Sequence, residues 1–205
     1  WRSANDSKMS DARFNDSVLV LVDIQNDFCP GGALAVREGD QVVPVANRLI
    51  PRFPVVVTTQ DWHPADHCSF KTQGGPWPPH CVQGSRGAEL HPDLDQSRIT
   101  FHVRKAFTRH ADSYSEFAGA DGQGRSLDDL LRKHEVKRLY VVGLATDYCV
   151  RATVLDGLQH GYEVFVITDG IRAANVHPDD GAKALAEMKQ AGAHLVTSKE
   201  VLALD

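Results

Sequence analysis

The sequence lacks several features that define common classes of protein. Its 205 residues contain no apolar run of the roughly 18 residues that a membrane span needs, and no signal-peptide-like segment near the start. The 22 basic and 27 acidic residues give a net charge of −5 without any basic block. Nucleic-acid binding needs a concentrated basic surface. We therefore expect a soluble, cytoplasmic protein with neither a nucleic-acid partner nor a membrane partner.

Cysteine is also scarce. The chain has four cysteines, Cys29, Cys68, Cys81 and Cys149, and none of them forms a C-x-x-C pair. Small secreted scaffolds carry a far denser set of cysteines, and structural zinc sites usually use such pairs. The four residues are therefore expected to be free thiols, of which at most one has special chemistry.

The chain shows no repeat and no linker between domains. Residues 1–16 are polar and without periodicity, so we predict a flexible tail there and a single domain over residues 17–205. Whether copies of the chain assemble into a homo-oligomer is left open by the sequence.

Strand-like and helix-like segments alternate along this domain. Short apolar runs predict strands, and segments with helical periodicity separate most of them. Residues 62–98 are rich in proline and glycine and predict a long functional loop. Because such alternation requires crossover connections, we predict an α/β fold of three layers, α/β/α, around a mostly parallel six-stranded sheet. The predicted strands are Val18–Ile24, Val55–Thr59, Ile99–Val103, Arg138–Val142, Val164–Thr168 and His194–Thr197, and the later helices are Ser126–His134, Thr146–His160 and Pro178–Ala191.

Chemically capable side chains stand at the carboxyl ends of the predicted strands, where open parallel sheets bind their ligands. Asp23 ends the first strand and Lys105 follows the third. Cys149 lies in the first turn of the helix after the fourth strand, where unpaired N–H groups and the helix dipole favour a thiolate. A nearby lysine would lower the thiol pKa further.

Each of these three residues also has an ordinary structural interpretation. Cys149 could simply fill a buried junction, Asp23 could cap a turn, and Lys105 could be a solvated surface residue. Together they form a nucleophile, a base and a fixed positive charge on one rim of the sheet. We therefore predict that they are catalytic.

A possible metal site follows the second strand. Asp61 and His63 are two residues apart, so in an extended segment both side chains point to the same side. His80, in the long loop, is a plausible third ligand. One carboxylate and two imidazoles fit zinc, iron or manganese, and we favour zinc.

Five motifs, in order, resemble those of the nicotinamidase and pyrazinamidase family, a branch of the isochorismatase-like cysteine hydrolases. They are DIQNDFCPGGALAV (Asp23–Val36), TQDWHPADHCSF (Thr59–Phe70), WPPHCVQGSRGAEL (Trp77–Leu90), KAFTRHADSYSEF (Lys105–Phe117) and GLATDYCVRATVLDG (Gly143–Gly157). One departure is Ala106, where the family usually has glycine, and this could alter the local backbone.

The resemblance implies an isochorismatase-like fold and hydrolysis of nicotinamide to nicotinic acid through a cysteine thioester, with pyrazinamide as a further substrate. It implies the triad Asp23, Lys105 and Cys149, and one divalent metal on Asp61, His63 and His80. It also implies an oxyanion hole of the Ala145 and Cys149 amides beside a cis peptide at Leu144–Ala145, and a pyridine pocket lined by Phe28, Trp77 and Tyr114. His67 matches a position that ligates the metal in some relatives and not in others.

Three other functions remain to be distinguished. A related amidase, such as one acting on N-carbamoylsarcosine, would keep the triad but generally lacks the metal cluster. An isochorismatase would lack the nucleophilic cysteine. A non-catalytic binding protein on the same fold would be expected to have lost part of the triad, and here every member is present.

Overall fold

The computed structural model describes residues 11–203, which contain one six-stranded sheet of order β3-β2-β1-β4-β5-β6. Every neighbouring pair is parallel, so the predicted fold class is confirmed and the sheet is parallel throughout. The strands are β1 (Ser17–Val22), β2 (Val55–Asp61), β3 (Phe101–Lys105), β4 (Arg138–Leu144), β5 (Glu163–Arg172) and β6 (His194–Val196). The helices are α1 (Val42–Leu49), α2 (Leu127–Lys133), α3 (Arg151–Gln159), α4 (Asp180–Gln190) and α5 (Ser198–Leu202).

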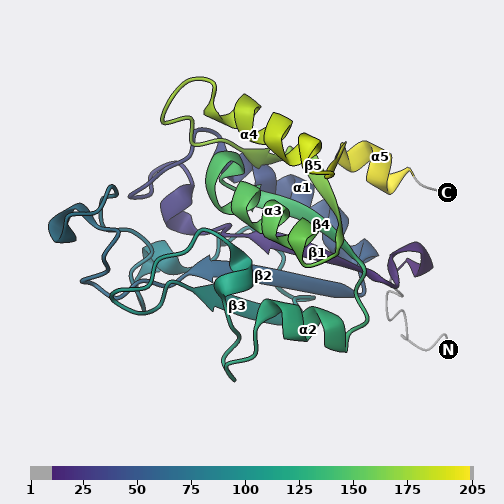
Figure 1. Ribbon diagram of the computed structural model, residues 1–205, viewed down its shortest axis with the longest axis horizontal. Coiled ribbons are helices and arrows are strands. Elements are labelled where there is room, and N and C mark those ends of the chain that lie inside the picture. Colours follow the sequence, from purple (N-terminus) through teal and green to yellow (C-terminus); the bar gives the residue numbers. More distant parts are fainter. Residues whose placement is uncertain (1–10, 204–205) are drawn as a thin grey trace, which may run out of the picture.

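Strand β1 explains the layered architecture. All of its residues are buried, and successive side chains of a strand point to opposite faces of the sheet. Leu19 and Leu21 join one hydrophobic core with residues of α1, α5 and Phe14. Val18, Val20 and Val22 join a second core with α2, α3 and α4. Figure 1 shows the result, with α3 in front of the strands and α1 behind them.

The strand order places a binding crevice at a defined point. From β1 the chain winds outward through β2 to β3, and then returns to β4 on the other side of β1. Ligands of open α/β sheets bind beyond the carboxyl ends of the strands where the winding reverses. In this fold that point lies between the ends of β1 and β4.

The long loop between β2 and β3 is irregular, as predicted, but it is well anchored. It contains the short 3₁₀ turns Lys71–Gln73 and Arg86–Ala88. Isolated bridges pair His63 with Val82 and Phe70 with Trp77. The blue to teal loops of this region extend to the left in Figure 1, away from the chain ends on the right. The loop therefore carries its residues to the carboxyl edge of the sheet.

Some boundaries differ from the prediction. The segment predicted as one helix from Thr146 begins with a π-helical turn, Thr146–Val150, and becomes α-helical in α3. Helix α5 was not predicted, because only five residues form it. It begins at a capping box in which Thr197 and Glu200 each accept a hydrogen bond from the other's backbone N–H.

The predicted flexible tail also ends earlier than expected. Residues 1–10 lie outside the described residues, but Ala12–Phe14 form a 3₁₀ turn. Phe14 is buried against Phe53 and Tyr140, with ring centroids 4.5 and 5.5 Å away. One aromatic side chain in a polar segment gives no periodicity, which is why the sequence pattern did not reveal this contact.

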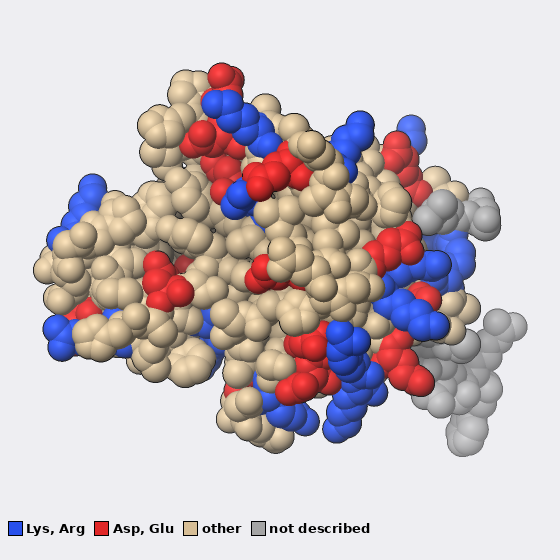
Figure 2. Space-filling model, viewed as in Figure 1, with Lys and Arg blue, Asp and Glu red and all other residues tan. Residues whose placement is uncertain are grey.

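Two further properties of the described residues concern their surface charge and their helices. On the face shown in Figure 2, basic and acidic side chains are intermingled. Within residues 11–203, no helix combines the length and the apolar character needed to cross a membrane.

The burial of Phe14 gives a test of the revised boundary. We expect Phe14→Ala to lower the free energy of unfolding by about 3 kcal/mol, because a buried ring is lost and a cavity remains. The same truncation at Phe107, which is 48% exposed, should cost about 0.5 kcal/mol or less. Urea unfolding of both variants measures the two losses, and equal losses would contradict the packing of Phe14.

Candidate active site

The ends of four neighbouring strands bring the predicted catalytic and metal-binding residues together. Asp23 follows β1, Asp61 ends β2 and Lys105 ends β3, where it is the register partner of Asp61. The turn Thr146–Val150, which contains Cys149, follows β4. Residues separated by more than a hundred positions therefore meet at the edge that the sheet topology predicts.

Lys105 is the electrostatic centre of this edge. Its side chain is 0% exposed, which excludes the interpretation as a solvated surface lysine. Its Nζ lies 2.7 Å from Asp23 Oδ2 and 2.5 Å from Asp61 Oδ1. Burial would lower the Lys105 pKa, but these two carboxylates raise it well above its usual value. The side chain is therefore a permanent ammonium ion inside the protein.

A second polar partner fixes Asp23. The Thr59 hydroxyl donates to Asp23 Oδ1 at 2.9 Å, and the Asp23 backbone N–H donates to the same hydroxyl oxygen at 3.1 Å. The residue has a positive φ of 47°, a conformation that aspartate tolerates better than most side chains. Lysine and threonine thus hold the Asp23 carboxyl group in a fixed orientation.

Cys149 is buried beside this group. Its Sγ and carboxylate oxygens of Asp23 and Glu116 all lie within 4.8 Å of one another. Burial raises the Cys149 pKa well above its usual value, Lys105 lowers it, and Asp23 and Asp61 raise it further. The expectation of a lowered thiol pKa is therefore wrong, because burial and carboxylates outweigh the lysine. A neutral thiol needs a base at the moment it reacts.

Asp61, His63 and His80 form a compact group whose possible ligand atoms lie within 4.8 Å of one another. The Nδ1 atoms of His63 and His80 face the backbone carbonyls of Ala106 and Pro78 at 3.0 and 2.8 Å. A carbonyl only accepts, so Nδ1 carries a proton in each ring and Nε2 is the nitrogen left to face a metal ion. Both Nε2 atoms approach Asp61 Oδ2, at 3.5 and 3.9 Å.

The protonation states of this group also suit a metal ion. Burial alone would raise the Asp61 pKa, but Lys105 and His63 hold it well below its usual range. Burial lowers the His80 pKa, which favours the neutral imidazole. An anionic carboxylate and two neutral imidazoles are the ligand forms that bind divalent ions. The donor set therefore fits the divalent metal expected from the sequence.

Residues outside the ligand set hold it in position. Gln25 clamps the backbone of Asp61 from both sides, accepting from its N–H at 3.0 Å and donating to its carbonyl at 2.9 Å. Asp27 accepts from the Cys81 N–H at 2.8 Å and so fixes the loop next to His80. Ala106 adopts a positive φ of 52°, a conformation that glycine adopts more easily, and still presents its carbonyl to His63.

His67 lies next to the group without joining it. Its ring stacks on His63 with centroids 4.1 Å apart. Its two ring nitrogens lie near Ser69 Oγ and the Ala111 carbonyl, at 2.7 and 3.0 Å. Both nitrogens thus face protein atoms, and His67 supports the ring of His63.

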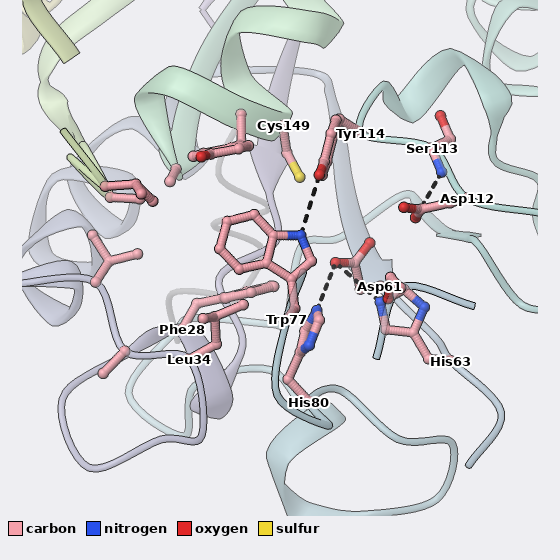
Figure 3. A pocket seen from close by; sticks show the side chains of 17 residues that line it. Phe28, Leu34, Asp61, His63, Trp77, His80, Asp112, Ser113, Tyr114 and Cys149 are labelled. Atoms are coloured by element: carbon pink, nitrogen blue, oxygen red, sulfur yellow. Dashed lines mark hydrogen bonds and ion pairs between the residues drawn. The ribbon is translucent and has the colours of Figure 1, made fainter. Parts of the chain in front are cut away.

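An apolar pocket opens between the thiol and the side chains of Asp61, His63 and His80. Trp77 Nε1 donates to Tyr114 Oη at 3.2 Å, and both rings pack edge-on against Tyr148. Figure 3 shows Cys149 pointing toward Trp77 and Tyr114, with Asp61, His63 and His80 gathered beside them. The three residues predicted for substrate binding, Phe28, Trp77 and Tyr114, all line this pocket. Ala145, predicted for the oxyanion hole, lines it as well.

The peptide between Leu144 and Ala145 is cis, as the family resemblance implied. Ala145 precedes the turn that contains Cys149, and the first N–H groups of a helical segment lack partners inside it. The remaining cysteines differ from Cys149 in that none of them lines the pocket. Cys29 and Cys81 are buried with raised pKa values, to about 11 for Cys29, and Cys68 is partly exposed.

The sequence did not identify two parts of the site. Glu116 is fully buried beside Lys105, and it comes from a loop without periodicity. Val176 lines the pocket from the loop between β5 and α4. Asp147 holds this loop by accepting from the N–H groups of Ala174 and Asn175 at 2.8 and 2.9 Å. Only the position of Asp147, two residues before Cys149, could have suggested its contact with the site.

The family model for the isochorismatase domain matches residues 17–200. The chain belongs to the isochorismatase-domain family. A nicotinamidase of Escherichia coli is 53% identical over 199 residues, which cover 87% of this chain and 93% of that protein. The resemblance to the nicotinamidase and pyrazinamidase branch of the family is thereby confirmed.

Two solved structures of the isochorismatase-domain family agree with this assignment. The Leishmania infantum protein PnC1 in complex with nicotinate has a TM-score of 0.84 and 40% identity, with 93% of this chain and 96% of that chain covered. The pyrazinamidase of Pyrococcus horikoshii in complex with zinc has a TM-score of 0.80 and 44% identity, with 89% and 99% covered.

The geometry of the histidines predicts which substitutions release the metal. We expect His80→Ala to weaken metal binding by about 100-fold or more, because a ligand is lost. His67→Ala should weaken it by about tenfold at most, because only a stacked neighbour is lost. Competitive titration with a chelator and metal analysis of the same samples measure both effects. A loss at His67 as large as that at His80 would make His67 a ligand.

Proposed function

We propose that this protein is a nicotinamidase that hydrolyses nicotinamide to nicotinate and ammonia through a thioester on Cys149, and that it also hydrolyses pyrazinamide. One observation carries this proposal: an aromatic pocket has the thiol on one side and an Asp-His-His group on the other. A flat heteroaromatic amide carries a ring nitrogen, which suits the Asp-His-His side, and a carboxamide, which suits the thiol side. The reaction would recycle nicotinamide for NAD synthesis.

Binding would orient the substrate before any bond changes. Phe28, Trp77 and Tyr114 would enclose the ring, and the carboxamide would then face Cys149. A divalent ion on Asp61, His63 and His80 would supply a Lewis acid for a ring nitrogen. Zinc is the proposed ion, and iron and manganese also suit these ligands. Holding the ring in one orientation keeps the carboxamide carbon next to the thiol and so lowers the barrier to attack.

Asp23 would act as the base in the first half-reaction. It takes the Sγ proton of Cys149 as the sulfur forms a bond to the carbonyl carbon. The Lys105 ammonium stabilises the negative charge on sulfur during this transfer. The carbonyl electrons move to the oxygen, which accepts hydrogen bonds from the Ala145 and Cys149 amides. When the C–N bond breaks, Asp23 returns its proton to nitrogen and ammonia leaves.

The second half-reaction would use the same carboxylate again. Asp23 takes a proton from water as the water oxygen attacks the thioester carbon. The C–S bond then breaks, the acid is released, and Asp23 returns the proton to the sulfur of Cys149. The catalytic groups are restored after the consumption of one amide and one water.

The alternative of a related amidase for a non-aromatic amide or ureide is less well supported. Such a substrate would use neither the aromatic walls of the pocket nor the Asp61, His63 and His80 group. Ammonia release from nicotinamide, pyrazinamide and N-carbamoylsarcosine, with metal analysis of the same sample, distinguishes the two functions. Preference for N-carbamoylsarcosine by metal-free protein would favour the alternative.

A cytoplasmic location belongs to the same proposal. All the cysteines are free in the structure, which is the usual state in a reducing compartment.

Replacement of the nucleophile provides the direct test of the proposed activity. We expect Cys149→Ala to lower ammonia release from nicotinamide by on the order of 10³-fold or more, because no thioester can form. Cys68→Ala removes a thiol that is not in the pocket and should retain near-normal turnover. A steady-state ammonia assay compares the two variants. Substantial turnover by Cys149→Ala would refute the covalent route.

A further inference from the structure

Glu116 is a buried acid that the mechanism above does not use. It begins the 3₁₀ turn Glu116–Ala118, and its backbone N–H donates to Thr153 Oγ1 of α3 at 3.0 Å. Its side chain is 0% exposed. The segment is thus anchored to the helix that follows Cys149, and it places a third carboxyl group beside Lys105.

Three buried carboxyl groups, those of Asp23, Asp61 and Glu116, surround the single ammonium of Lys105. Glu116 Oε1 lies 3.0 Å from Lys105 Nζ, which donates two of its three N–H groups to Asp23 and Asp61. Neither carboxyl oxygen of Glu116 accepts a hydrogen bond from the described residues. A buried carboxylate without donors is costly, whereas a neutral carboxylic acid itself has a proton to donate.

The surroundings of Glu116 favour this neutral form. Burial raises the Glu116 pKa well above its usual value, the neighbouring Asp23 raises it further, and Lys105 opposes the rise. Close carboxyl groups rarely ionise together, so one of them keeps a proton. Asp23 has two donors, Thr59 and Lys105, which favour its ionised form. The proton therefore belongs on Glu116.

We propose that Glu116 is a positioning residue, held as a neutral carboxylic acid, which donates a hydrogen bond to Asp23. This proposal rests on the proposed function, in which Asp23 is the base. The bond gives Asp23 a third donor, after Thr59 and Lys105, and so fixes its orientation and keeps it ionised. A neutral Glu116 also adds no negative charge beside the sulfur of Cys149, where a thiolate must form.

Two variants of similar size separate this role from simple filling of space. Glu116→Gln keeps an N–H donor for Asp23 and cannot ionise, so we expect near-wild-type kcat and KM. Glu116→Met fills the space without a donor. We expect its kcat to fall by about tenfold or more with KM for nicotinamide nearly unchanged, because the base is less well held and less stabilised as an anion.

The pH profile supplies a readout that packing alone would not change. In Glu116→Met the acid limb of kcat/KM should move to higher pH by about one unit or more, because the ionised base has lost a donor. The charged and titratable groups around Glu116, namely Asp23, Lys105, Asp61 and Cys149, are the same in both variants. The acid limb of Glu116→Gln should therefore stay close to that of the wild type.

Several results would overturn the proposal. Equal impairment of the glutamine and methionine variants would show that an ionised glutamate is needed. A methionine variant with normal kcat, or with reduced kcat but no shift of the acid limb, would leave Glu116 without the positioning role. Metal analysis of each variant excludes loss of the ion as the cause. Cys149→Ala, assayed alongside, shows separately whether the thioester route itself fails.

A spectroscopic measurement covers the case in which Glu116→Met does not fold. The infrared difference spectrum between wild-type protein and Glu116→Gln, at neutral pH with the metal bound, should contain the carbonyl stretch of a protonated carboxylic acid. A carboxylate band in its place would overturn the proposal.

Discussion

A single buried ammonium ion organises the site. Lys105 lies at the end of β3, and its Nζ contacts carboxylates that follow β1 and end β2. Removing one partner of a buried ion pair leaves an uncompensated charge, which typically costs about 3–5 kcal/mol. Asp61, in the proposed metal site, and Asp23, the proposed base, therefore share one counter-ion. Its place at the end of the edge strand β3, beside the end of β2, sets the separation between the two halves of the site.

This arrangement has a consequence for the nucleophile. Because the ammonium is already paired with carboxylates, it does not produce a stable thiolate at Cys149. In the proposed mechanism the thiol stays protonated until a substrate is in place, and Asp23 then accepts its proton. Asp61 is another carboxylate partner of Lys105, and it stays anionic and available for a cation. One charge would thus serve both the proposed proton transfer and the proposed metal site.

Periodicity and strand ends were sufficient to predict the parallel sheet, and with it the meeting of Asp23, Lys105 and Cys149 at one edge. The family motifs added the cis peptide and the aromatic walls. The sequence could not reveal Glu116 or Val176, because loops place them and no spacing rule applies there. The thiol pKa was also mispredicted, since burial depends on tertiary packing. Ala106, where the family usually has glycine, takes a positive φ and presents its carbonyl to His63, a conformation that the residue type alone does not predict.

The central claim is that this charge arrangement lets a neutral thiol form a covalent bond to the substrate. Rapid acid quenching of the wild-type protein during its first turnover of nicotinamide, followed by peptide mass analysis, tests it most directly. The account predicts that ammonia is released before nicotinate and that a nicotinoyl group is found on the peptide containing Cys149. Simultaneous release of ammonia and nicotinate, with an unmodified Cys149 peptide throughout, would contradict it.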